Sequence, residues 1–358
     1  MFDNSFLISL IGFLVVLTPL VFIHELGHYL AAKKNGVKVE QFSVGFGPEL
    51  IGFTDKYHTR CKLCLIPFGG YVKMKGELLV NKENFQTNND YEGYFNNASL
   101  FARLSIVFSG PLANILLGIL IITTLYTFHG RYEVKPEVNQ VIKGSPAERS
   151  GLKPGDLIVS INNQKVSNFE DIKQIVIKNK NYLNFEILRK KQLLFFNIKP
   201  EILDKKDLEI KTYKIGIIAS SPVLIQHDFI SSIYYGLKDT LLLTYEWIKG
   251  FVKLIRFDVD KKDIAGPIGI AKISGNAISL GLPNFLFLMA LLSINLGLIN
   301  LLPIPALDGG YILMYFTEFI LGRPINQKIQ FKLIQIGVFF LISLMIVITF
   351  FDIQKLFV

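Results

Sequence analysis

Four long stretches of the chain contain no Asp, Glu, Lys or Arg and consist mostly of apolar residues. These stretches cover residues 5–23, 104–128, 283–307 and 333–351. A helix of about 20 apolar residues crosses the hydrocarbon core of a bilayer, and its backbone groups pair within the segment. The pattern therefore predicts an α-helical polytopic membrane protein with four transmembrane helices, over residues 5–33, 100–128, 283–307 and 331–351.

A different pattern follows the first predicted span. Residues 37–73 alternate apolar and polar positions, as in VKVEQF and RCKLCL, and glycine-rich turns interrupt them. Such alternation is typical of strands. Non-helical backbone at membrane depth is tolerated only where protein or a watery cavity shelters it. We therefore expect a re-entrant β element within the first membrane half, which covers residues 1–128.

The long segment between the second and third spans has the makeup of a soluble insert. Residues 129–202 contain the turn Lys153-Pro154-Gly155-Asp156 and the strand-like residues 157–161, and we expect one compact domain here. Residues 203–358 then form the second membrane half. Within it, residues 228–256 carry apolar side chains at three- and four-residue steps with charges between them. That spacing predicts an amphipathic helix that lies at the membrane surface.

Composition and charge support the bilayer as a partner. Apolar residues make up 51% of the chain, charged residues 19%, and the mean hydropathy is +0.40. The net charge of +9 would suit either nucleic acid or an anionic membrane surface. The long apolar runs favour the membrane, so we expect no nucleic-acid partner.

Basic residues flank two of the predicted spans. They are Lys33, Lys34 and Lys38 after the first span, and Arg323, Lys328 and Lys332 between the last two. Short cytoplasmic flanks are enriched in Lys and Arg, so these flanks are expected to face the cytoplasm. The insert between the second and third spans is then extracytoplasmic.

The sequence His24-Glu25-Leu26-Gly27-His28 lies at the end of the first predicted span. Residues i and i+4 share one face of a helix, so His24 and His28 can bind one metal ion. Glu25 is expected to act as the general base that takes a proton from water. Ionisable residues inside a membrane are costly and are by default functional, which favours a metal site over a chance match.

A third ligand is expected at the end of the third span. Asp308 is the first charged residue after Lys272. The first and third spans run in the same direction, so His24 and Asp308 are expected at a similar depth near the cytoplasmic face. The alternative role for Asp308 is a cap on the helix predicted at residues 311–320.

The motifs HELGH, FSGPLAN and NLLPIPALDGG resemble those of the site-2 protease family. VGFGP, IPFGGYVKM and GPIGIAK are similar to the bacterial branch, the RIP zinc metalloproteases that cleave anti-sigma factors. The insert resembles a bacterial PDZ domain through GSPAERSGLKPGDLIVSIN. The resemblance implies intramembrane hydrolysis of peptide bonds with Zn²⁺ as cofactor, at the bacterial inner membrane.

The same resemblance assigns roles to individual residues. It implies that His24, His28 and Asp308 bind zinc and that Glu25 is catalytic. It also implies a substrate-binding role for Gly45, Phe46, Gly47, Asn300, Pro303 and Pro305. The expected substrates are single-span membrane proteins, such as anti-sigma factors or remnant signal peptides, which unwind and pair with a strand edge near the GFG turn.

Two other functions remain open from the sequence. One is a non-catalytic membrane scaffold that docks peptides through its PDZ domain, although a scaffold needs no HExxH motif. The other is an iron oxygenase, because two histidines and one carboxylate also suit iron. The predicted domain folds provide no evident pocket for the cosubstrate of an oxygenase.

Overall fold

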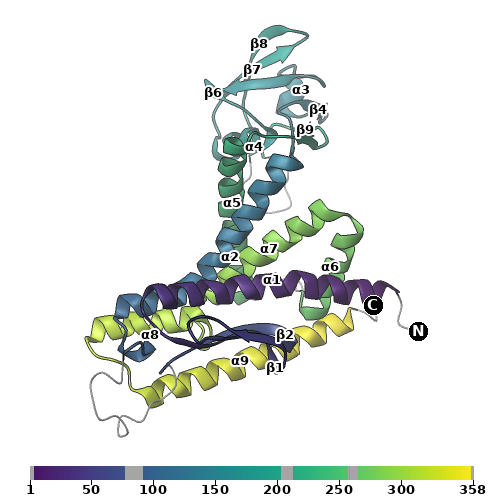
Figure 1. The fold of residues 1–358 in the computed structure, drawn as a ribbon. Coiled ribbons are helices and arrows are strands. Elements are labelled where there is room, and N and C mark those ends of the chain that lie inside the picture. The colour runs from purple at the N-terminus through teal and green to yellow at the C-terminus, as the bar shows by residue number, and fades with distance from the viewer. Residues whose placement is uncertain (1–3, 77–91, 203–212, 257, 259–264, 356–358) are drawn as a thin grey trace. The chain divides into compact units, whose positions relative to one another are not determined.

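The computed structural model describes residues 4–76, 92–202, 213–256, 258 and 265–355. The chain forms two compact units. The first unit combines residues 1–127 with residues 228–358, and the second unit contains residues 128–227. The ribbon in Figure 1 shows the elements of both units.

The first unit is mainly helical. Its helices and strands are α1 (Asn4–Lys34), β1 (Val39–Thr54), β2 (Arg60–Met74), η3 (Phe95–Asn97), α2 (Leu100–Phe128), α5 (Phe229–Ile255), α6 (Pro267–Ser279), α7 (Leu282–Asn300), α8 (Asp308–Leu321) and α9 (Gln327–Gln354). Among the described residues, α1, α2, α7 and α9 are long and apolar enough to cross a membrane. The four predicted spans are therefore present as helices, and the chain is a multi-pass membrane protein.

The third of these helices is shorter than the sequence pattern predicted. Helix α7 ends at Asn300, whereas the apolar run continues to Leu307. Pro303 and Pro305 explain the difference, because proline has no backbone N–H and disfavours helix in the residue before it. Residues 301–307 form a tight turn in which the backbone of Ala306 has a φ of 82°. The turn leads directly into α8, whose first residue is Asp308.

Small residues allow the helices of the first unit to pack closely. A Cβ added to Gly27 of α1 would lie 2.4 Å from the backbone oxygen of Ser109 in α2. A Cβ added to Gly297 of α7 would lie 2.8 Å from the backbone oxygen of Pro111, also in α2. Small residues at helix crossings are typical of membrane proteins, where packing rather than hydrophobic burial holds helices together.

The β1–β2 hairpin folds into a small sheet beside α1 (Figure 1). Residues 41–44 pair with residues 70–73 on one side and with residues 60–63 on the other. Residues 60–63 also pair with residues 51–54. The segment 70–73 therefore forms one edge of the sheet among the described residues. The strand content expected for residues 37–73 is present, and the re-entrant depth of this element stays a prediction.

An ionic cluster fastens the turn between β1 and β2 to the end of α1. The Asp55 carboxylate accepts hydrogen bonds from Lys33 at 2.7 Å and from the Tyr29 hydroxyl. Backbone N–H groups of Tyr57 and Thr59 donate to the same carboxylate. Partial burial acts to raise the pKa of the Asp55 carboxyl, but these hydrogen bonds outweigh burial and hold the pKa below its usual range.

Helix α5 has the predicted extent, and Asp228 caps its N-terminus. It packs against α2, and its position at the membrane surface stays a prediction. The Tyr126 hydroxyl of α2 donates to Asp239 of α5 at 2.7 Å. A Cβ added to Gly236 would lie 2.5 Å from Thr123 Oγ1. Tyr235 and Leu243 pack against apolar residues of α2 and α7.

The second unit is a β-rich fold, with two helices among its described residues. Its elements are β3 (Arg131–Glu133), β4 (Val138–Val141), α3 (Pro146–Arg149), β5 (Leu157–Ile161), β6 (Gln164–Lys165), α4 (Phe169–Lys178), β7 (Leu183–Arg189), β8 (Gln192–Ile198), β9 (Ile217–Ala219) and β10 (Val223–Ile225). The main sheet has the order β6-β5-β7-β8. Asn168 begins α4 with a capping box, and fully buried side chains such as Ile158 and Phe185 form the core.

This unit extends further along the chain than the domain predicted at residues 129–202. Strand β9 pairs with β4, and β10 pairs with β3. Both added strands lie at residues 217–225, which the sequence pattern assigned to the second membrane half. Short strands that pair with the far end of a domain carry little local signal, which explains why the pattern did not reveal them.

Candidate metal centre

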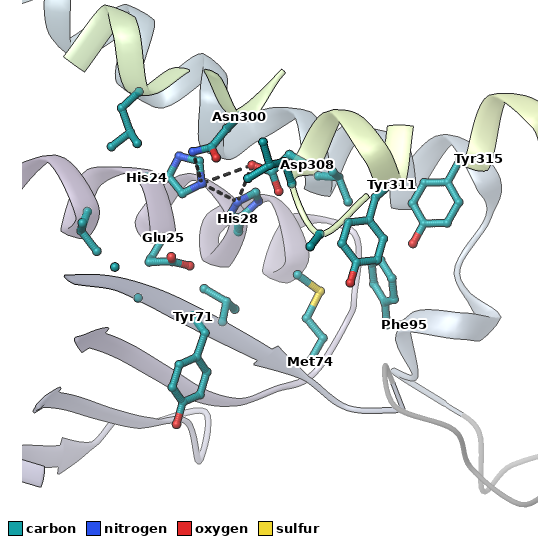
Figure 2. A pocket seen from close by; sticks show the side chains of 18 residues that line it. His24, Glu25, His28, Tyr71, Met74, Phe95, Asn300, Asp308, Tyr311 and Tyr315 are labelled. Carbon is teal, nitrogen blue, oxygen red and sulfur yellow. Dashed lines mark hydrogen bonds and ion pairs between the residues drawn. The ribbon is translucent and has the colours of Figure 1, made fainter. Parts of the chain in front are cut away.

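Three ligand groups from distant parts of the sequence meet in the first unit (Figure 2). His24 and His28 come from one face of α1, and Asp308 is the first residue of α8. The Nε2 atoms of the two histidines lie 3.2 Å apart. Oδ2 of Asp308 lies 3.2 Å from His24 Nε2 and 3.5 Å from His28 Nε2. The candidate zinc ligands predicted from the sequence are therefore close neighbours.

The spacing of these atoms fits a zinc ion. Zinc binds histidine nitrogen and carboxylate oxygen at about 2.0–2.2 Å in tetrahedral geometry, which separates neighbouring ligand atoms by about 3.4 Å. The observed separations of 3.2 to 3.5 Å match this value. Two nitrogens and one oxygen are also a donor set that leaves a fourth position open, as in catalytic zinc sites.

A hydrogen bond orients His28 for metal binding. Its Nδ1 lies 2.9 Å from the backbone oxygen of Ile106 in α2. A carbonyl oxygen can only accept a hydrogen bond, so Nδ1 carries the proton and is the donor. The lone pair is then on Nε2, the atom that faces His24 and Asp308. Such bonds to the outer ring nitrogen fix the tautomer and orientation of metal-binding histidines.

Glycine residues provide the space that the centre requires. A Cβ added to Gly110 of α2 would lie 2.2 Å from His28 Nε2. A Cβ added to Gly309 would lie 2.2 Å from the Leu302 backbone oxygen, and one added to Gly310 would lie 2.4 Å from that of Ile304. Glycine at these positions therefore lets α2 pass beside His28 and lets the 301–307 turn fold tightly against α8.

A second ion pair holds α8 in place. Arg103 of α2 contacts Glu318 of α8 through two hydrogen bonds, of 2.6 and 3.2 Å, and both side chains are nearly buried. The Arg103 guanidinium also lies 4.8 Å from the centre of the Tyr315 ring. Asp308 and Glu318 belong to the same helix, so this contact fixes the element that carries the third candidate ligand.

Glu25 lies beside the candidate ligands and lines the same cavity, which has a volume of about 360 Å³ (Figure 2). The Glu25 side chain is buried, with 7% of its surface exposed. The edge segment of the sheet passes directly next to it. A Cβ added to Gly70 would lie 2.8 Å from Glu25 Cγ, so only glycine allows this approach. Glu25 is thus placed between the metal centre and a strand edge.

The structure separates the predicted substrate-binding residues into two groups. Asn300 lines the cavity, and its Nδ2 lies 3.5 Å from His24 Nε2. The lining residues do not include Gly45, Phe46, Gly47, Pro303 and Pro305. Phe46 instead stacks on Tyr71 of the edge segment, at 6.1 Å between ring centres. Pro305 packs against α9, where a Cβ added to Gly337 would lie 1.7 Å from the Pro305 oxygen.

Several cavity residues were not among the sequence predictions. They are the edge residues Gly69, Gly70, Tyr71, Val72 and Met74, together with Phe95, Tyr311 and Tyr315. The spacing of the two tyrosines from Asp308 contains the signal, because residues i, i+3 and i+7 share one helix face. The edge segment had no comparable signal, since the alternating pattern does not show which strand lies at an edge.

The fold and the site together define a class of protein. Among the described residues, four helices are apolar enough to cross a membrane, and one of them carries a buried HExxH motif. A carboxylate from a separate helix completes a three-ligand set beside a glutamate. These are the components of a metalloprotease built into a membrane domain.

Comparisons with known proteins identify the family. A profile of Peptidase family M50 matches residues 12–344. A candidate zinc metalloprotease of Rickettsia conorii is 38% identical over 98% of this chain and its own full length. A candidate zinc metalloprotease of Mesorhizobium japonicum is 36% identical over 91% of this chain and 93% of its own. The chain belongs to peptidase family M50, the site-2 proteases, and its cofactor is Zn²⁺.

Solved structures also resemble part of the chain. The PDZ domain of the SdrC-like protein from Listeria monocytogenes is 22% identical, with a TM-score of 0.21. The match covers 25% of this chain and 90% of that structure.

Proposed function

We propose that this protease hydrolyses peptide bonds within or next to the transmembrane segments of other membrane proteins. The observation that carries the proposal is the position of the three-ligand cluster. Two ligands lie on α1, a helix apolar enough to span a bilayer, and the third begins α8 just after another such helix. A site built from these elements meets its substrate at membrane depth.

His24, His28 and Asp308 are the proposed zinc ligands. Zinc held there supplies a Lewis acid that polarises the scissile carbonyl and makes water a better nucleophile. Glu25 takes a proton from the attacking water and passes it to the leaving amine. Burial of Glu25 strengthens its electrostatic interactions with the reacting groups, because fewer water dipoles screen them.

The edge segment of the β1–β2 sheet is the proposed substrate-binding surface. A helical substrate has its peptide groups paired within the helix, so it must unwind before a carbonyl can be attacked. Gly69, Gly70, Tyr71, Val72 and Met74 line the cavity, and residues 70–73 form a sheet edge. Pairing with such an edge replaces the lost hydrogen bonds. Phe46, with Gly45 and Gly47, would then act indirectly by supporting this edge. Asn300 would contact the substrate, while Pro303 and Pro305 shape the turn before Asp308.

The proposed substrates are single-span membrane proteins, such as anti-sigma factors or remnant signal peptides. A strand edge recognises backbone rather than sequence, which suits segments of varied apolar composition. The proposed location is the bacterial inner membrane, with the site toward the cytoplasm and the second unit outside. Lys33 and Lys34 in the last turn of α1 support this orientation. Cysteines introduced at Lys38 and Arg323 should be labelled from the cytoplasm, and one at Lys143 from outside.

We also propose that the second unit is a PDZ domain that limits access by substrates with large external domains. It holds a mostly apolar cavity of about 260 Å³ between α4 and residues 213–217. Ile172 and Val176 on α4 line this cavity, as do residues 213–217, which lead into β9. Replacement of residues 129–226 by a flexible linker, which removes β3 to β10 together, should permit cleavage of a substrate whose folded external domain the full chain rejects. Unchanged rejection would contradict this role.

Zinc analysis and a cleavage assay on the purified, detergent-solubilised protein test the proposed site. His24→Ala, His28→Ala and Asp308→Ala should each lower zinc content and abolish cleavage of a synthetic transmembrane peptide. If Asp308→Ala keeps full zinc content and activity, Asp308 only begins α8 and the third ligand lies elsewhere. His58→Ala, at an exposed histidine in the hairpin turn, is the matched control and should leave both readouts unchanged.

A further inference from the structure

Asn114 of α2 lies beside the metal centre and is completely buried, with 0% of its surface exposed. Its Nδ2 lies 3.3 Å from Nδ1 of His24. Its Oδ1 has no hydrogen-bond partner among the described residues. Burying an amide without full hydrogen bonding is unfavourable, so an apolar residue would serve simple packing better. The position therefore indicates a polar role.

The chemistry of His24 shows what that role requires. Its Nε2 is the atom that faces His28 and Asp308. A neutral imidazole binds a metal through the nitrogen that carries the lone pair, and its proton is then on the other nitrogen. Nδ1 of His24 must therefore be an N–H donor when Nε2 binds the ion. An N–H at this buried position needs an acceptor within hydrogen-bond distance.

The amide of Asn114 provides this acceptor when it is turned over. Oxygen and nitrogen of an asparagine amide have nearly the same size, and the hydrogen-bond network decides which is which. A half-turn about the last side-chain bond places Oδ1 where Nδ2 now faces His24 Nδ1. Oδ1, which has no partner in the present orientation, then accepts a hydrogen bond from the N–H that metal binding requires at His24 Nδ1.

We propose that Asn114 is a positioning residue of the metal centre, whose side-chain oxygen accepts a hydrogen bond from His24 Nδ1. The bond selects the tautomer of His24 that presents its lone pair to the ion. This inference rests on the proposed role of His24 as a ligand. Both histidines then have the same arrangement. The backbone oxygen of Ile106 accepts a hydrogen bond from His28 Nδ1, as the Asn114 oxygen accepts one from His24 Nδ1. Helix α2 therefore orients both imidazoles.

Contacts with α7 hold Asn114 at its position. The Ser293 hydroxyl of α7 donates to the Asn114 backbone oxygen at 2.7 Å, and Ser293 is itself fully buried. Gly297, one turn further along α7, brings that helix against the Pro111 backbone. The segment of α2 that carries Asn114 is therefore fixed by contacts with α7, which suits a residue that must hold another in a set orientation.

Zinc affinity of the full-length protein, measured by competition with a chelator, tests the proposal. Asn114→Leu keeps the branched shape of the side chain and removes the acceptor, so zinc should bind about 10- to 100-fold more weakly, the usual effect of losing such a partner. Asn114→Asp keeps an acceptor and should retain zinc. Thr123→Val, at another buried polar residue of α2, is the control and should match the wild type.

The Asp variant separates an acceptor role from a packing role. If the Asn114 amide serves packing alone, its acceptor oxygen does not matter, and Leu and Asp should affect zinc affinity alike. Cobalt-substituted protein adds a second readout, since its visible spectrum should change with Leu and not with Asp. Wild-type zinc affinity in Asn114→Leu, or equal weakening by Leu and Asp in folded protein, overturns the proposal.

The same titration distinguishes failure of this inference from failure of the proposed site. His24→Ala should lose zinc binding. If His24→Ala retains wild-type affinity, the ligand assignment itself is wrong. If His24→Ala loses zinc while Asn114→Leu does not, the ligand assignment stands and only the positioning role of Asn114 is wrong.

Discussion

The two units of the molecule bury polar residues to different extents. In the second unit most of the fully buried side chains are apolar, among them Ile158, Leu183, Phe185 and Ile187. In the first unit many of the most buried side chains are polar, and they include His24, Asn114, Ser274 and Ser293. Meanwhile Phe339 and Ile346 of α9 have 73% and 65% of their surface exposed.

This difference reflects two solvents. Water drives apolar side chains together in the second unit, and burial of apolar surface stabilises its fold. Lipid provides no such force between helices, so packing at small residues and hydrogen bonds between polar groups determine where helices meet. The buried polar groups of the first unit therefore help to determine where its helices meet, and some of them also form the candidate metal centre.

Gly110→Ala should have the largest effect, because it fills space that His28 occupies. The added Cβ would lie 2.2 Å from His28 Nε2, so the ring must move. Displacing a reacting group by about 1 Å can cost about 100-fold in rate. We expect at least that loss in peptide cleavage, together with weaker zinc binding. Wild-type zinc affinity and activity would show that α2 is not in close contact with the centre.

Phe185→Ala should destabilise the second unit and leave the metal centre unaffected. Phe185 is fully buried among apolar side chains, and removing such a ring costs about 3–5 kcal/mol. The unfolding of this unit, followed by limited proteolysis, should become easier while zinc content stays at the wild-type level. Loss of zinc in this variant would mean that the two units depend on each other for stability.

Glu318→Gln tests the ionic contact that the first unit buries. It leaves the Arg103 guanidinium without its charged partner, and breaking a buried pair in this way costs about 3 kcal/mol. We expect a lower melting temperature and reduced zinc occupancy, since Asp308 lies on the same helix. Glu246→Gln removes an exposed partner of Lys249 and should change neither quantity measurably.

Gly155→Ala should have the smallest effect and completes the comparison with Gly110. Gly155 has a φ of 87°, and nothing described lies within 4 Å of an added Cβ. The cost is therefore only backbone strain, about 1 kcal/mol. A thermal scan should show a small shift, with normal zinc content and cleavage. A large loss of activity would indicate a contact of this turn that the fold does not explain.

The apolar pattern predicted the membrane helices well because their length and composition are imposed by the bilayer. Helix α2 covers the predicted residues, and α1 differs from the prediction by one residue at each end. The error at the end of α7 arose because an apolar run was counted through Pro303 and Pro305. Backbone rules for proline would have ended that helix near Asn300.

The candidate site was only partly predictable. The HExxH spacing and the position of Asp308 in an apolar region indicate metal ligands, because a charged side chain is costly in such surroundings and is by default functional. The sequence pattern did not show that residues 70–73 form a sheet edge, or which residue contacts His24. Both depend on which elements become neighbours in the fold, and a single sequence does not contain that information. Asn114, a buried amide in an apolar helix, did carry a local signal of function.

Glu25→Gln provides the most direct test of the central claim, that the buried centre beside the strand edge performs peptide hydrolysis. The substitution keeps the shape of the side chain and removes its ability to take a proton, and it changes no proposed ligand. Cleavage of a synthetic transmembrane peptide should fall at least about 100-fold, the usual contribution of a general base, while zinc content stays at the wild-type level. Cleavage at a substantial fraction of the wild-type rate by the zinc-loaded variant would contradict the account.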